Sequence, residues 1–104
     1  MEYKNLGRTG VKISSIALGS DDFGDGTSSQ VAEKIIIRSV DAGINLIDTG
    51  NLYAGGESEK IIGKTLKLNN IRHKVIISTK VDHAPRKKGV SLDKFVPELP
   101  PNVQ

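Results

Sequence analysis

The chain has 104 residues, no cysteine, a formal net charge of +3 and 4% aromatic residues. This length corresponds to one small domain, and the lack of cysteine excludes support by disulfides. The small, dispersed charge and the few aromatic residues argue against a nucleic-acid-binding surface. No apolar run approaches the roughly 20 residues of a membrane span, and the polar residues 1–5 are unlike a signal peptide, so we expect a cytoplasmic protein.

The first predicted element is a hairpin. Residues 3–6 and 11–14 flank the turn signal Gly7-Arg8-Thr9-Gly10, which favours two short antiparallel strands. A short apolar strand is then predicted at residues 16–18, ending at Gly19. The polar, glycine-punctuated residues 20–26 predict a loop.

A helix is predicted over residues 28–42. Thr27 and Gln30 have the spacing of a capping box, and Gly43 is suited to a left-handed stop. Between them, apolar residues recur with helical period: Ala32, Ile35, Ile36 and Val40.

The next strand is predicted at residues 44–47 and is expected to be buried on both faces of the sheet, and Asp48 is the first charged residue past it. A second helix is predicted over residues 58–68, with Ser58 at its start and Glu59 in its positive first turn. Its inward stripe is formed by Ile61, Ile62, Thr65 and Leu66, and Asn69-Asn70 ends it. A further strand at residues 75–79 leads to Lys80.

Alternating strands and helices are typical of βαβ units, so the predicted fold class is α/β with parallel strands. Neighbouring parallel strands would deliver Asp48 and Lys80 to the same edge of the sheet, with Tyr53 in the loop above. An acid, an amine and a phenol at such an edge indicate an active site. The alternative is a structural ion pair with a surface tyrosine beside it.

The sequence motifs around these residues are similar to those of the aldo-keto reductase family. They are Asp48-Thr49-x-Asn51-x-Tyr53, Gly-x-Ser58-Glu59-x-x-Ile62-Gly63 and Ser78-Thr79-Lys80, preceded by Tyr3-x-x-Leu6-Gly7-x-Thr9-Gly10 and Leu18-Gly19. The resemblance covers about residues 2–81 and implies a partial (β/α)8 TIM barrel: the N-terminal hairpin, the first three parallel strands and two helices. Because a complete barrel takes about 250 residues, residues 1–83 resemble the N-terminal part of one.

The resemblance implies reduction of small carbonyl compounds by hydride from NADPH. Asp48, Tyr53 and Lys80 match three of the family's four catalytic residues: Tyr53 would donate the proton, which requires lowering the pKa of a phenol from about 10. Gly19, Ser20 and Asp48 match cofactor-binding positions, although Gly19 has the alternative interpretation of a simple turn. Asp21-Asp22 departs from the family's usual neutral residues. No metal is expected.

The fourth catalytic residue, a histidine, and the family's main phosphate-binding loops have no counterpart in this sequence, since His73 and His83 stand at the wrong positions. Residues 84–104 are predicted to form a divergent, irregular tail that is basic and rich in proline, with Arg86-Lys87-Lys88 as a solvated loop. The hypothesis is therefore a truncated, inactive fragment. The alternatives are a noncatalytic interaction or regulatory protein that retains part of the barrel and, least supported, a nucleic-acid-binding module.

An incomplete barrel would leave strand edges unpaired. We therefore expect the isolated chain to be marginally stable or to self-associate through its open sheet edge.

Overall fold

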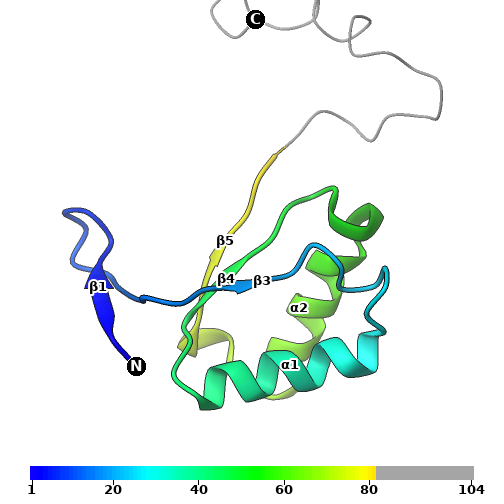
Figure 1. Cartoon of the computed structure of the whole chain (residues 1–104), viewed down its shortest axis with the longest axis horizontal. Helices are drawn as coiled ribbons and strands as arrows, with labels where there is room; N and C mark the ends of the chain where they lie inside the picture. Colours follow the sequence, from blue (N-terminus) through cyan, green and yellow to red (C-terminus); the bar gives the residue numbers. More distant parts are fainter. Residues whose placement is uncertain (82–104) are drawn as a thin grey trace, which may run out of the picture.

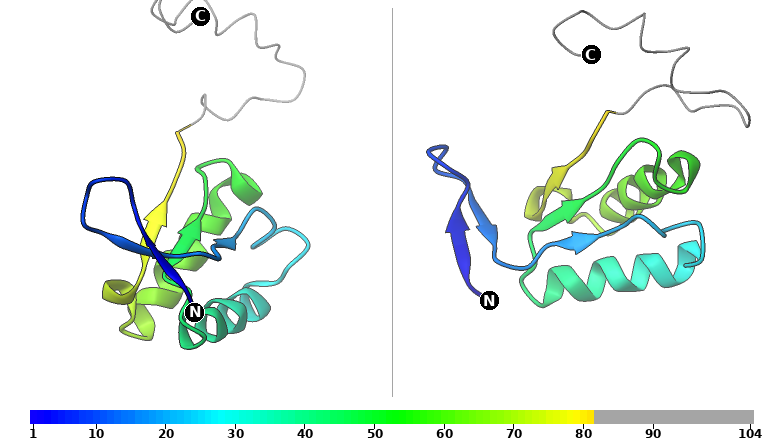
Figure 2. Two further views of the ribbon diagram at one scale, coloured as in Figure 1. Left: turned by 60° about the vertical axis from the view of Figure 1, so that its left-hand side comes forward. Right: turned by 45° about the horizontal axis from the view of Figure 1, so that its top comes forward.

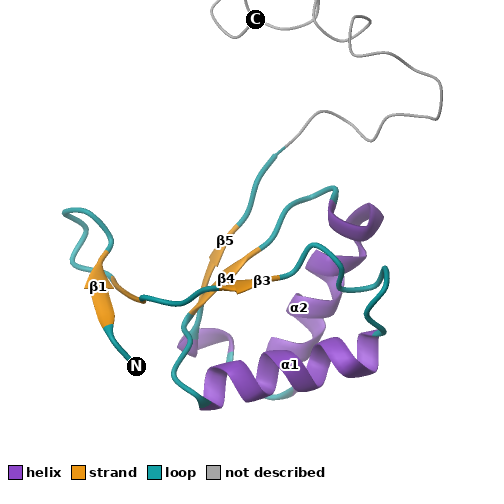
Figure 3. Ribbon diagram, in the orientation of Figure 1, coloured by secondary structure: helices purple, strands orange, loops and turns teal. Residues whose placement is uncertain are grey.

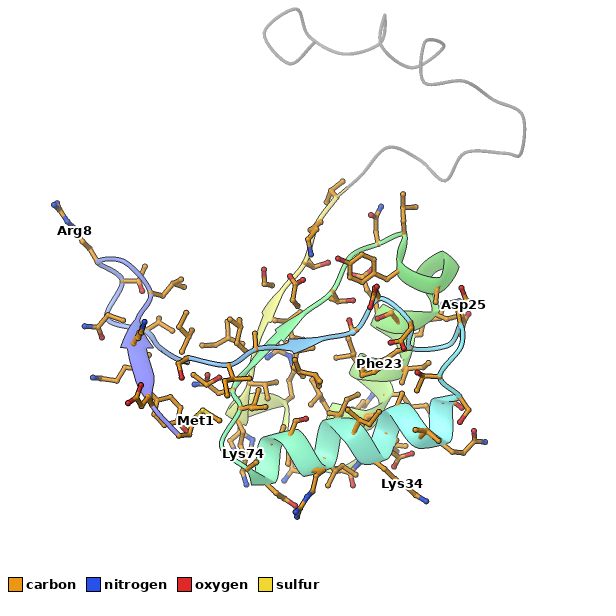
Figure 4. The ribbon with its side chains drawn as sticks, viewed as in Figure 1. Met1, Arg8, Phe23, Asp25, Lys34 and Lys74 are labelled. Atoms are coloured by element: carbon orange, nitrogen blue, oxygen red, sulfur yellow. The ribbon has the colours of Figure 1, made fainter. Side chains whose placement is uncertain are left out.

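The computed structural model describes residues 1–81, which contain a hairpin, a small sheet and a helical layer (Figure 1). The hairpin pairs β1 (Tyr3–Asn5) with β2 (Lys12–Ser14) in antiparallel register. It stands apart from the helices in the right-hand view of Figure 2, and Arg8 lies at its tip in Figure 4. The predicted hairpin is confirmed.

The sheet that carries the site has three parallel strands in the order β3-β4-β5 (Figure 3). They are β3 (Leu18–Gly19), β4 (Leu46–Asp48) and β5 (Ile76–Ser78). Gly19 is opposite Asp48, and Asp48 is opposite Ser78. The register therefore aligns the carboxyl ends of all three strands at one edge.

Two helices pack together on one side of this sheet (Figure 2). They are α1 (Ser29–Asp41) and α2 (Glu57–Leu68), accompanied by the short 3-10 segments η1 (Tyr53–Gly56) and η2 (Arg72–Lys74). The shared core consists of Phe23, Ala32, Ile36, Ile47, Ile62, Leu66 and Val75. The predicted inward faces of both helices are confirmed because most of these residues belong to the stripes read from the sequence.

The start of α1 differs from the predicted capping box. Ser28, not Thr27, is the N-cap, and its hydroxyl accepts from the Val31 N–H at 3.3 Å. Thr27 is held by the preceding loop instead, because its N–H and hydroxyl both donate to Asp22. The helix ends as predicted, with Gly43 at a φ of +97°.

The strand predicted at residues 16–18 begins only at Leu18. Just before it, the Ser15 N–H donates to the Glu2 carbonyl and the Ser14 hydroxyl donates to the Ile16 carbonyl. These bonds tie the segment to the hairpin, so pairing with β4 starts later.

The strand predicted at residues 44–47 is not buried on both faces of the sheet, which corrects the expectation. Ile47 is 1% exposed and packs against the helices, whereas Ile44 and Leu46 are only partly buried. Side chains alternate between the faces of a strand, and in the described residues the helices cover one face.

The outer edges of β3 and β5 have no partner strand among residues 1–81. Self-association through such an edge stays a prediction. No helix in this part of the chain is long and apolar enough to cross a membrane. The predicted tail, residues 84–104, lies outside the described residues.

Candidate active site

The carboxyl ends of β4 and β5 bring Asp48 and Lys80 together, as the sequence predicts. The Lys80 Nζ donates to Asp48 Oδ1 at 2.8 Å and to the Thr49 carbonyl at 2.9 Å. Strand pairing continues beyond β5, since the Thr49 N–H donates to Ser78 and the Asn51 N–H donates to the Lys80 carbonyl. The backbone thus places the lysine beside the carboxylate.

Tyr53 completes the group from the tight turn that follows β4. The Lys80 Nζ lies 5.0 Å from the centroid of the Tyr53 ring. The ring packs over Gly50, where an added Cβ would come within 3.3 Å of two ring atoms. A left-handed turn then leads into α2, and it includes the non-glycine residue Ala54 at a φ of +52°. The turn sets where the phenol points.

The charge on Lys80 is stabilised by these neighbours. The hydrogen bond to Asp48, followed by the interaction with the nearby Tyr53, raises the pKa of Lys80 above its ordinary value of 10.5. The Lys80 and Asp48 side chains are 51% and 41% exposed, so water still reaches the pair. Lys80 is therefore an accessible, permanently charged ammonium group at neutral pH.

A buried set of hydroxyls lies beneath this ion pair. The side chains of Ser20, Thr49 and Ser58 are at most 1% exposed. The Ser20 hydroxyl donates to the Asp48 carbonyl at 2.7 Å, and the Ser58 hydroxyl donates to the Ser20 carbonyl at 2.7 Å. The single proton of the Ser58 hydroxyl is used in the bond to the Ser20 carbonyl. Thr49 Oγ1 is therefore the donor in its 3.1 Å contact with Ser58 Oγ.

Ser58 therefore differs from the predicted helix start. The helix begins one residue earlier, after Gly56 in a left-handed conformation, and the Ser58 hydroxyl turns inward. Its spacing gave a usable signal, since Ser58 precedes Ile62 and Thr65 at helical intervals on the buried stripe. Thr49 and Thr79, to which the motifs of the sequence assigned no role, contact the site region too.

The predicted cofactor-binding positions have different environments. Gly19 is exposed, and an added Cβ would meet no atom within 4 Å. Ser20 directs its hydroxyl inward at the backbone of Asp48. Asp21 and Asp22 are exposed, and Asp22 holds the loop by accepting from Thr27. Open space therefore lies beside Gly19, next to Asp48.

Among residues 1–81, no group of three or more histidine or acidic side chains is arranged to hold a metal ion.

The family model described as "Aldo/keto reductase family" matches residues 15–98. The chain belongs to this family. It is 35% identical over 104 residues to the "Probable voltage-gated potassium channel subunit beta" of Oryza sativa subsp. japonica, covering 95% of this chain and 32% of that protein. It is 41% identical over 86 residues to the "Uncharacterized oxidoreductase YrpG" of Bacillus subtilis, covering 78% and 26%.

Solved aldo-keto reductase structures share the fold. The thermostable enzyme Tm1743, in complex with the inhibitor epalrestat, gives a TM-score of 0.69 at 34% identity, over 78% of this chain and 31% of that chain. The holo form of AKR11C1 from Bacillus halodurans gives 0.72 at 31% identity, over 86% and 28%. The described residues are thus an α/β partial barrel, and the chain spans about a quarter to a third of the length of these relatives.

Proposed function

We propose that this chain carries the proton-donating part of an NADP-dependent reductase site for aldehydes or ketones, with Tyr53 as the proton donor. The observation that carries the proposal is the convergence of Asp48, Tyr53 and Lys80 at the carboxyl ends of β4 and β5. In barrels of this kind, that end of the sheet is where active sites lie.

The chemistry follows from the charges. A positive charge close to a phenol favours the phenolate that remains after the proton leaves, and Lys80 supplies that charge beside Tyr53. Asp48 fixes the ammonium group by a 2.8 Å hydrogen bond. Tyr53 then protonates the carbonyl oxygen of the substrate to give the alcohol.

A nicotinamide cofactor, when bound, supplies the hydride for the carbonyl carbon. The residues present fit a flat ring at one place: the open space beside Gly19, which pairs with Asp48. A side chain larger than glycine at residue 19 would project into that space. Gly19 and Asp48 would line the ring, while the inward-facing Ser20 hydroxyl would hold the loop rather than touch the ring.

Replacing the matched segment of Tm1743 with residues 1–81 of this chain would test the proposal in a complete barrel. We expect this chimera to consume NADPH with a reactive aldehyde, followed by nicotinamide absorbance. Tyr53→Phe should lower kcat by about 10² to 10⁴ because a positioned general acid contributes that much. Tyr3→Phe, which removes the phenol that donates to the Gly43 carbonyl away from the site, is the matched control. Full activity in Tyr53→Phe would refute the proposal.

The 104 residues by themselves are expected not to turn over carbonyl substrates. Orienting the hydride donor against the carbonyl requires more of the barrel than the described residues contain. The assay is NADPH consumption by the purified chain, alone and with the remaining barrel of Tm1743 added as a second polypeptide. Turnover by the chain alone that disappears in Tyr53→Phe would contradict this expectation.

The second candidate is a noncatalytic interaction or regulatory protein that retains part of the barrel. It is supported by the similarity to a rice protein whose name describes it as a probable channel subunit. The same chimera separates the two candidates: NADPH binding detected by fluorescence, with no reduction of any aldehyde tested, would favour the regulatory candidate.

A further inference from the structure

The first turn of α2 contacts the ends of all three strands through two consecutive side chains. Ser58, which is 0% exposed, reaches the loop after β3 through the Ser20 carbonyl and the segment after β4 through Thr49 Oγ1. Its Oγ also lies 3.0 Å from the Ser20 hydroxyl, which in turn donates to the Asp48 carbonyl. Ser58 thus links the ends of β3 and β4 directly beneath Asp48.

Glu59 reaches the remaining strand. Its Oε2 accepts from the Thr79 hydroxyl at 2.7 Å, and Thr79 is the residue between β5 and Lys80. The backbone on the other side of Thr79 is paired as well, since the Thr49 N–H donates to the Ser78 carbonyl. Glu59 therefore restrains the segment from which the lysine projects.

We propose that Ser58 and Glu59 are positioning residues, which clamp the three strand ends so that Asp48 and Lys80 meet beside Tyr53. The inference deepens the proposed function and rests on it. The ion pair is half-exposed, and exposed charges on flexible stems hold one another only weakly. The fixed geometry must therefore come from the backbone on each side, which these two residues hold.

Nuclear magnetic resonance on the full chain tests the inference at Thr79, which is exposed and so tolerates substitution. Thr79→Val removes the hydroxyl donor without changing charge, and Thr79→Ser keeps it. We expect Thr79→Val to bring the pKa of Lys80 back toward 10.5. We also expect the Asn51 amide, which donates to the Lys80 carbonyl, to exchange about tenfold faster, as loss of one hydrogen bond allows. Thr79→Ser should leave the Lys80 pKa and the Asn51 exchange rate as they are in the unsubstituted chain.

The Ser58 and Glu59 variants test each side of the clamp. Glu59→Gln keeps an acceptor for Thr79 and Glu59→Ala does not, so the difference between them measures the hydrogen bond apart from the charge. Ser58→Ala should accelerate exchange of the Thr49 amide about tenfold. Ser14→Ala, which removes a buried hydroxyl at the opposite end of the sheet, should lower thermal stability without changing the Lys80 titration.

An unchanged Lys80 titration in both Thr79→Val and Glu59→Ala would overturn the inference. Thr79 is exposed and Glu59 is half-buried, so these two variants test the inference even if Ser58→Ala fails to fold. An ordinary Lys80 pKa in the unsubstituted chain would overturn it as well, because there would be no pair to position. The proposed function is judged separately, by the effect of Tyr53→Phe in the Tm1743 chimera.

Discussion

The two ends of the three-stranded sheet are held by different chemistry. At the amino end, Asn45 accepts from the Ser14 N–H at 2.7 Å and donates to the Lys12 carbonyl at 2.9 Å. At the carboxyl end, buried hydroxyls support an exposed ion pair between Asp48 and Lys80. The link between the hairpin and the sheet uses neutral groups only, whereas the carboxyl end combines neutral groups with charges.

The difference separates stability from chemistry. The amino end joins the hairpin to the sheet, a task that needs geometry and no charge. The carboxyl end keeps an ammonium group accessible to solvent while the hydroxyls of Ser20 and Ser58 are buried below it. We therefore expect substitutions at the amino end to change folding alone, and substitutions at the carboxyl end to change the site as well.

The largest expected effect is at the amino end. Asn45→Ala removes two side-chain hydrogen bonds, and a loss of about 2 kcal/mol in the free energy of unfolding should follow at about 1 kcal/mol each. Urea unfolding followed by circular dichroism measures it, with the exposed Asn5→Ala in β1 as the control. A change in the Lys80 titration in Asn45→Ala would show that the two ends are coupled, against this comparison.

A smaller difference is expected between two glycine variants in the loop above the carboxyl end. Gly24 and Gly26 have φ values of +97° and +88°, so alanine is strained by roughly 1 kcal/mol at either position. At Gly24 the new Cβ would also lie 2.8 Å from the Glu57 Cβ, whereas at Gly26 it meets nothing within 4 Å. Gly24→Ala should therefore destabilise by about 1 to 2 kcal/mol more than Gly26→Ala. Equal urea midpoints would mean that the loop does not pack on α2.

The smallest effect concerns pH. Because the folded-state pKa of Lys80 is raised, its contribution to stability is fully present below the ordinary value of 10.5 and is lost as pH rises through the folded pKa. The effect is small because the pair is exposed. Urea midpoints measured from neutral pH to above 10.5 should fall more steeply in the unsubstituted chain than in Asp48→Asn. Parallel curves would show that the ion pair is not formed in solution.

Most of the fold could be predicted because its signals are local. The helical period of Ala32, Ile35 and Ile36 and the glycine stop at Gly43 each depend on neighbours a few residues away. The meeting of Asp48 with Lys80 was predictable for a similar reason: both residues follow apolar strands, and parallel neighbouring strands end at one edge.

The sequence by itself determined the order of strands and helices, the inward stripes and the pairing of Asp48 with Lys80. Only the tertiary structure decided that Ser28 rather than Thr27 caps α1, and that Ser58 faces the core instead of beginning a helix. The physical reason is that a hydroxyl bonds whichever group comes within reach. For Thr27 that group is Asp22, and for Ser58 it is Ser20, which is 38 residues away in the sequence and adjacent only after the chain folds.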